Sequence, residues 1–390
     1  MLALPSPQRS SRSWLAEHEG HSDISRWHIP KGHEAPGAFI KRCARNALPD
    51  SVAHFFHPTR ATLASKDDGH EMTQQWSSRK HRKQWYQYRS PTTGGSRHRD
   101  TMLGKLALMG KFEYWNISWW VAQAFTWGSV VWVINGFAVF LPFCNSHFDK
   151  APNSSGWTAF LGATIFEFGS VFAIWEAWNA DTQAFELYMG RAVARVKDDM
   201  ESMKKVVEDA MNHNGRKHES PQVTMAEFAD PAEKSPEQER PKWVWFSTET
   251  KYWHELGWYA AFFQVIAASI FWISGFTAIP TIQDAISTHT GLLAGVFWVP
   301  QVIGGTGFVI SSTFIMLEAQ HVWYLPELRS LGWHVGFWNF VGGVGFTLSG
   351  GFGFNKAHWS QYQSALSTFW GGWAFLIGSV IQWYESVNTV

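Results

Sequence analysis

The stretch that decides the fold runs from Gly162 to Glu176 and reads GATIFEFGSVFAIWE. Two later stretches follow the same pattern without gaps: 304–318 reads GGTGFVISSTFIMLE, and 371–385 reads GGWAFLIGSVIQWYE. Each copy has Gly first, Phe four residues later, a Gly-Ser or Ser-Ser pair, and Glu last. The remaining positions are almost entirely apolar or small, so each copy predicts an apolar helix within a repeated unit.

The shared positions fall on one stripe of such a helix, because successive residues are rotated by about 100°. Small residues on a stripe allow helix backbones to approach closely in a membrane. The stripe positions are therefore predicted to be structural: Gly162, Phe166, Ser170 and Glu176 in the first copy; Gly304, Phe308, Ser312 and Glu318 in the second; Gly371, Phe375, Ser379 and Glu385 in the third. We expect the terminal acids to lie at the headgroup level and to pair with Lys111, Lys251 or Arg329.

Six stretches are long and apolar enough to cross a bilayer, which needs roughly 20 apolar residues per helix. They contain no Lys or Arg and lie at 117–142, 157–179, 257–280, 292–317, 331–354 and 367–387. The charged residues, 16% of the 390-residue chain, are concentrated in 1–110 and 181–251, which excludes a single soluble domain. The predicted fold class is an all-α membrane protein with six transmembrane helices.

The basic residues predict the orientation of the spans. Of the 32 Lys and Arg, only Lys150 and Lys356 lie in the loops on the second side of the predicted membrane. The positive-inside rule then places both termini in the cytoplasm. The first 16 residues contain Arg and Ser but no acid, so mitochondrial import is kept as a minor alternative.

The spans pair into three tandem two-helix repeats at 111–180, 252–318 and 319–390. The first span of each repeat carries a Trp that precedes a Gly by 17 residues, and a small polar residue stands just before that Gly. These polar residues are Asn135, Ser274 and Ser349.

The segment Gly371–Ser379, which reads GGWAFLIGS, resembles the second helix of the YrhK-like domain, a two-helix membrane module without an assigned activity. The whole chain also resembles uncharacterised fungal integral membrane proteins with long polar N-termini. The close match covers one hairpin of three. The resemblance therefore implies a membrane-helix architecture and no catalytic residue.

The segment 1–110 has little apolar periodicity, and we expect it to be mostly disordered. It contains a basic run next to Trp85, Tyr86 and Tyr88. Ahead of a membrane span, such a run favours anionic lipid headgroups over nucleic acid, which is not expected as a partner; a solvated tail is the plain alternative. The residues predicted to contact headgroups are Arg79, Lys80, Arg82 and Lys83.

The second polar segment, 181–251, is predicted to contain a helix at 181–212 and a flexible linker after it. Apolar residues between 189 and 210 recur at alternating spacings of four and three. This seam suits a protein partner or self-association, and packing on the same chain explains it equally well.

No catalytic signature, metal-binding motif or cofactor motif occurs in the chain, so we expect no enzyme, metal or cofactor. The anomaly is Glu167, an acid about halfway through the second span, where it is either functional or held by one interhelical hydrogen bond. The intramembrane polar residues at similar depth are Gln123, Gln264, Gln301 and Asn339.

Two function classes remain. The first is a non-enzymatic scaffold or adaptor in the bilayer, because long polar segments accompany spans that are nearly free of charge. The second is a small transporter or channel for protons or cations that uses Glu167.

Overall fold

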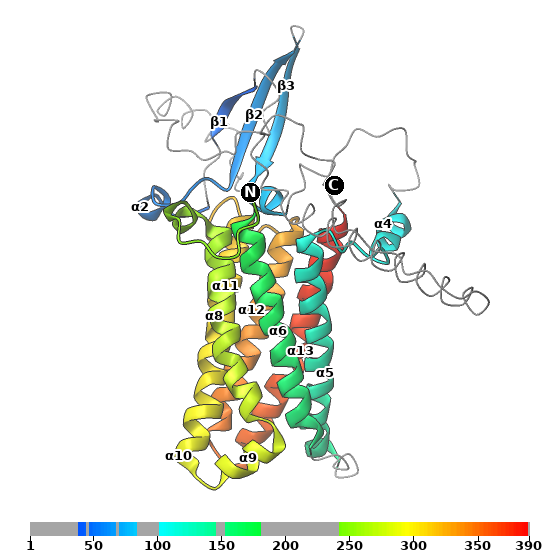
Figure 1. Cartoon of the computed structure of the whole chain (residues 1–390), viewed down its shortest axis with the longest axis vertical. Helices are drawn as coiled ribbons and strands as arrows, with labels where there is room; N and C mark the ends of the chain where they lie inside the picture. Colours follow the sequence, from blue (N-terminus) through cyan, green and yellow to red (C-terminus); the bar gives the residue numbers. More distant parts are fainter. Residues whose placement is uncertain are drawn as a thin grey trace, which may run out of the picture.

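The computed structural model of the chain describes residues 38–43, 47–67, 70–83, 101–145, 153–180 and 242–388. In these ranges six long helices stand side by side (Figure 1). They are α5 (Ile117–Cys144), α6 (Ser154–Trp178), α8 (Leu256–Thr277), α11 (Val299–Ala319), α12 (Leu331–Gly353) and α13 (His358–Val387). Each helix packs against the next, and α13 packs against α5, so the bundle is a closed ring.

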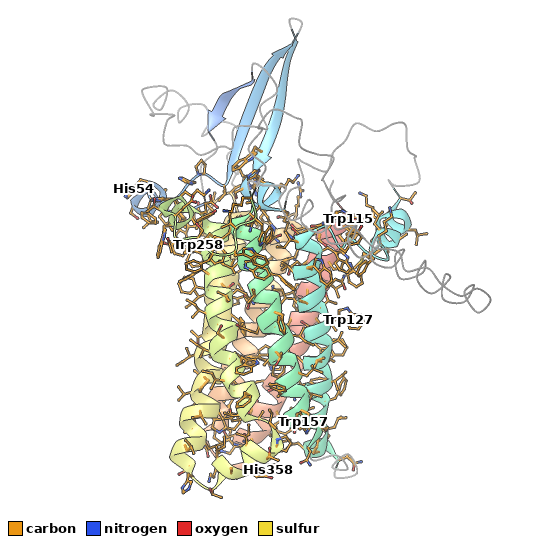
Figure 2. All side chains as sticks on the ribbon, viewed as in Figure 1. His54, Trp115, Trp127, Trp157, Trp258 and His358 are labelled. Atoms are coloured by element: carbon orange, nitrogen blue, oxygen red, sulfur yellow. The ribbon has the colours of Figure 1, made fainter. Side chains whose placement is uncertain are left out.

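Among the described residues, five helical segments are long and apolar enough to cross a membrane. They are α5, α6, α8, α13 and the continuous helical stretch Thr290–Ala319. The remaining predicted span, 331–354, corresponds to α12, which has 23 residues but is rich in Gly and also contains His334 and Asn339. Large apolar side chains such as Trp127 (Figure 2), Phe168 and Ile303 are exposed on the outside of the bundle, as they are in proteins surrounded by lipid.

Local sequence signals explain where several helices begin. The side chain of Asn116 accepts hydrogen bonds from the backbone N–H groups of Ser118 and Trp119, which caps α5. The short helix α9 (Pro280–Ser287) starts at a proline, which lacks the N–H that a first turn would leave unpaired. The helix α10 (Thr290–Leu293) continues through a π-helical turn (Ala294–Trp298) into α11, whose second residue is Pro300.

A small antiparallel sheet lies beyond one end of the bundle (Figure 1), here called the sheet end. Its order is β1 (Ala38–Cys43), β2 (Arg60–Asp67) and β3 (His70–Ser77), with Asp67 paired to His70. A short helix, α3 (Ser78–Arg82), follows β3 directly. Shorter helices lie at α2 (Asp50–Ala53), α4 (Met102–Leu108) and the 3-10 turn Thr250–His254. The opposite end, where α9 and α10 lie, is called the far end (Figure 1).

The structure corrects two predictions of secondary structure. The segment 1–110 was expected to be mostly disordered, but 38–83 contains the three strands and α3. The last helix begins at His358, well before the predicted residue 367, because the polar residues of its first turns lie among the neighbouring helices. The predicted helix at 181–212, with its seam at 189–210, lies outside the described residues.

Candidate functional site

Three glutamates meet at the sheet end of the bundle, one from the last turns of each of α6, α11 and α13. They are the terminal acids of the three repeated stretches. Glu176 and Glu318 are 2% exposed and Glu385 is 4% exposed, so all three carboxylates are removed from water. Burial of three like charges is unfavourable unless each has a counter-charge.

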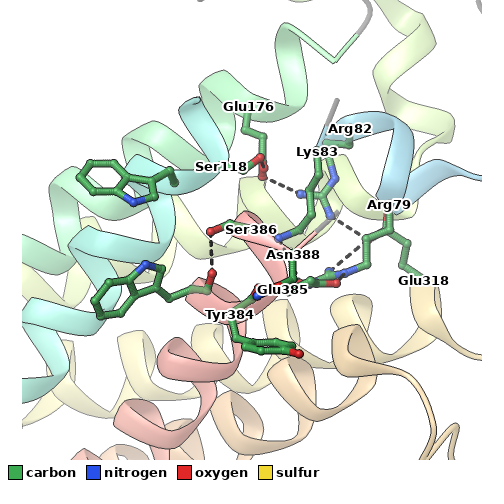
Figure 3. A network of polar contacts seen from close by, with 12 residues as sticks. Arg79, Arg82, Lys83, Ser118, Glu176, Glu318, Tyr384, Glu385, Ser386 and Asn388 are labelled. Atoms are coloured by element: carbon green, nitrogen blue, oxygen red, sulfur yellow. Dashed lines mark hydrogen bonds and ion pairs between the residues drawn. The ribbon is translucent and has the colours of Figure 1, made fainter. Parts of the chain in front are cut away.

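The counter-charges come from α3 and the residue after it (Figure 3). Arg79 donates two hydrogen bonds to Glu385, from Nε to Oε1 at 2.9 Å and from Nη2 to Oε2 at 2.7 Å. Arg82 bridges the other two acids, at 2.9 Å from Glu176 Oε2 and 2.7 Å from Glu318 Oε2.

Lys83 adds the third positive charge, since its Nζ lies 3.1 Å from Glu385 Oε2. Three cations thus face three anions in a buried group with no formal net charge. The group is called the ion cluster and consists of Arg79, Arg82, Lys83, Glu176, Glu318 and Glu385.

Equivalent positions near the starts of α5, α8 and α12 make room for the ion cluster. Ser118, one residue before Trp119, donates a hydrogen bond to Glu176. The corresponding residues of the other two helices are Gly257 and Gly332. A Cβ atom at Gly257 would lie 2.7 Å from Arg82 Nε, and one at Gly332 would overlap the side chain of Arg79. A larger residue at either position would require the ion-paired side chains of the cluster to shift.

The electrostatic environment differs between the two ends of α3. Burial alone would lower the pKa of Arg79. The negative charge of Glu385 and its hydrogen bond with Arg79, together with the charges of Glu318 and Glu176, outweigh burial and raise the pKa above its usual range. For Lys83 burial outweighs the attraction of Glu385, and its pKa is lowered. Arg79 is thus the firmly charged partner, whereas burial disfavours the charged form of Lys83.

These contacts correct the predictions for the basic run. Arg79, Arg82 and Lys83 were expected at lipid headgroups, but they are buried against the glutamates; Lys80, on the same helix, is half-buried. The predicted partners of the acids were also wrong, because the ion pairs use α3 rather than the lysines and arginine beside the spans. Lys251, for example, pairs with Glu249 at 3.2 Å. Three buried acids require three cations nearby. The closely spaced basic residues at 79–83 were the sequence signal that could have identified them.

Aromatic side chains fill the middle of the bundle in two layers. The inner aromatic layer, nearer the ion cluster, consists of the three repeat phenylalanines Phe166, Phe308 and Phe375, whose ring centroids are 5.4–6.2 Å apart. The outer aromatic layer consists of Trp132, Phe271 and Phe346, at 4.8–5.4 Å. Both layers belong to one buried core.

A cavity lies on each side of these layers. The small cavity, of about 50 Å³, lies between the ion cluster and the inner aromatic layer, and Ser129, Gln264, Ser311 and Asn339 contribute to its lining. The large cavity, of about 310 Å³, lies between the outer aromatic layer and the far end. Gln301 contributes to its lining and donates a hydrogen bond to Ser349.

Glu167 lies apart from the ion cluster, at the contact between α6 and α8. Its Oε1 accepts a hydrogen bond of 2.9 Å from Ser269, a partner that the sequence did not single out. The predicted partners are engaged or placed elsewhere: Gln264 accepts a hydrogen bond from Ser311, and Asn339 Oδ1 lies against Gly378. Gln123 is buried within α5. Glu167 is not among the described residues that line either cavity.

Within the described ranges, no group of three or more His, Cys, Asp or Glu side chains is arranged to hold a metal ion. Comparison of the chain with protein-family models, curated proteins and solved structures found no match. The resemblance to the YrhK-like domain therefore stays a prediction.

Proposed function

We propose that the protein is a non-enzymatic membrane scaffold, in which the six-helix bundle is the anchor and the N-terminal sheet is the element that it holds and presents. The main support for this proposal is the ion cluster. It ties α3, and through α3 the end of β3, to three different helices of the bundle. A segment held by buried ion pairs at three points keeps a fixed position, as a presented binding element requires.

We further propose that α12 also crosses the membrane and that the bundle consists of three repeated hairpins. Equivalent residues of the three units meet in sets of three in the ion cluster and in each aromatic layer. The closed ring of helices supports the same arrangement, because three similar units around one axis leave no free edge.

In this proposal the sheet end and both termini face the cytoplasm, as the distribution of Lys and Arg favours. The bilayer surrounds the exposed apolar side chains of the bundle. The remaining basic residues of 1–110 meet anionic headgroups, and a protein partner or a second copy of the chain binds through 189–210. The organelle is left open, with the mitochondrion as the minor alternative.

The alternative of a proton or cation transporter has less support. Six aromatic rings occupy the middle of the bundle between the two cavities. Glu167, the residue expected to carry the ion, lies at a helix contact with Ser269 rather than beside either cavity.

Flux measurements in proteoliposomes test the proposal. We expect the wild type and Glu167→Gln to show no proton or potassium flux above that of protein-free liposomes. Flux in the wild type would contradict the scaffold function; its loss in Glu167→Gln would make Glu167 the coupling site, and its retention would place the pathway elsewhere.

A second measurement addresses presentation of the sheet. Spin labels on β3 and on the sheet end of α11 should give one narrow distance distribution in the wild type. The triple variant Arg79→Gln, Arg82→Gln and Lys83→Gln should broaden it. An exposed substitution at the same end, Glu249→Gln, serves as the control and should leave the distribution narrow. An equally narrow distribution in the triple variant would show that the ion cluster does not position the sheet.

A further inference from the structure

The large cavity at the far end is lined by aromatic and polar residues for which the scaffold function gives no role. Its floor is the outer aromatic layer, and its walls come from all six long helices of the bundle, from α9 and from the π-helical turn. All three small polar residues of the repeat, Asn135, Ser274 and Ser349, contribute to its lining. A volume of about 310 Å³ is at the lower end of the range of small-molecule sites.

The charged lining of this cavity is acidic. Of the described residues that line it, Asp284 alone is ionisable, and it lies exposed at the rim on α9. No Lys, Arg or His is among those residues. An anionic ligand would therefore meet a carboxylate and no counter-charge.

Three amide side chains of the cavity use donors for hydrogen bonds inside the protein. The NH2 group of Asn135 donates to the backbone oxygen of Ser155 at 2.7 Å. That of Gln361 donates to the backbone oxygen of Asn355 at 2.6 Å, and that of Gln301 to Ser349 at 2.9 Å.

Gln283 contributes a hydrogen-bond acceptor to the cavity. Its side-chain oxygen is buried at the cavity and has no hydrogen-bond partner among the described residues. A buried acceptor without a partner is costly, and a ligand that donates to it or carries positive charge would relieve that cost.

We propose that the large cavity binds a small organic ammonium ion. The aromatic rings of Trp132, Phe271 and Phe346, which contribute to the lining, supply the kind of attraction that such cations find in aromatic cages. The unpartnered side-chain oxygen of Gln283 and the carboxylate of Asp284 add to it. This site is independent of the ion cluster, which lies beyond both aromatic layers.

The test uses the purified full-length chain in nanodiscs and three probes of similar shape. Tritiated choline is the cation, 3,3-dimethylbutan-1-ol is its neutral isostere, and 3,3-dimethylbutyrate is an anion. We expect saturable choline binding in equilibrium dialysis, with the neutral isostere competing about tenfold more weakly than unlabelled choline. The anion should not compete.

Two variants on the short helix α9 separate the cavity from other sites. Asp284→Asn should weaken choline binding by about three- to fivefold and leave the affinity of the neutral isostere unchanged. Gln283→Leu should also weaken choline binding. Glu249→Gln, which removes an exposed acid at the opposite end, is the matched control and should bind choline as the wild type does.

Equal affinity for choline and its neutral isostere would overturn the proposal. So would the absence of saturable choline binding by the folded wild type, or choline binding unchanged in both α9 variants. Size-exclusion chromatography of both variants distinguishes a loss of fold from a loss of choline binding.

Discussion

At the residue scale, the ion cluster depends on matched numbers of opposite charges in a place without water. A buried ion pair gains little net stability when intact, because desolvation offsets the attraction. Loss of one partner is different, since the other charge then stays buried without compensation. Glu318 is the clearest case, as it lies 2.7 Å from Arg82 and 3.7 Å from Arg79.

We therefore expect Glu318→Gln to lower the free energy of unfolding by about 3 kcal/mol. The measurement is chemical unfolding in detergent, with Glu249→Gln as the exposed control of the same chemistry. Addition of Arg82→Gln to Glu318→Gln should restore part of the loss, because the charges match again. A double variant less stable than Glu318→Gln would show that Arg82 stabilises the fold without its carboxylate partner.

The inner aromatic layer gives a second prediction at this scale. Phe308 is fully buried and contacts Phe166 and Phe375, so Phe308→Ala would leave a cavity. The expected cost is about 3–5 kcal/mol. Phe246→Ala is the control, because Phe246 is exposed at the sheet end. A similar loss of stability in both variants would contradict the central role of this layer.

At the element scale, the helices approach one another through glycines. A Cβ atom at Gly345 of α12 would lie 2.8 Å from the Cα atom of Gly371 in α13 and 2.9 Å from the backbone oxygen of Ser367. Backbone atoms of a packed helix cannot move aside separately, so relief of the overlap requires the two helices to separate.

Gly345→Ala should therefore lower the stability of the bundle by about 1–3 kcal/mol. Gly351→Ala is the matched control on the same helix, because a Cβ atom at Gly351 meets nothing within 4 Å. That control should leave the melting temperature unchanged or raise it, since Ala favours helix more than Gly does. Equal melting temperatures for the two variants would show that α12 and α13 tolerate separation.

The elements also show what the sequence could predict. The apolar stretches located the helices because length and hydropathy are local properties, and the repeat placed the three glutamates at one end. The sheet was missed because the strands are largely polar and lack a clear apolar alternation, as in HEMTQQWS at 70–77. The Asp68-Gly69 pair between β2 and β3 was the available signal, since Asp-Gly is typical of hairpin connections.

Local sequence patterns could not identify the ion-pair partners of the three glutamates. Arg79 and Glu385 are separated by 306 residues, and the sequence around either residue does not identify the other as its partner. Glu167 illustrates the same limit: its depth was evident from the sequence, whereas its contact with Ser269 depends on how α6 packs on α8.

At the scale of the whole molecule, α3 closes one end of the bundle and the aromatic layers separate the two cavities. Ser274 lines the large cavity and Ser129 the small one, and both are buried. Their side chains therefore report on access from the two ends.

Cysteine labelling tests this separation in a background in which Cys43 and Cys144 are replaced by Ser. A small hydrophilic thiol reagent should modify Ser274→Cys and leave Ser129→Cys unmodified. Combination of Ser129→Cys with Arg79→Gln, Arg82→Gln and Lys83→Gln should make the cysteine reactive, because α3 no longer covers the small cavity. Rapid labelling of Ser129→Cys with α3 intact would mean that water reaches the middle of the bundle.

The sequence positions of the ion cluster also set an order of biosynthesis. Arg79 leaves the ribosome before any of the bundle helices, and its partner Glu385 follows 306 residues later, in the last helix. Arg79 and Lys83 therefore lack their carboxylate partner until α13 has been made and has joined the ring, whereas the partners of Arg82, Glu176 and Glu318, are made earlier. Pairing of Arg79 and Lys83 with Glu385 then completes the ion cluster only when the whole bundle is present, and a chain truncated before Glu385 would leave both cations without that partner.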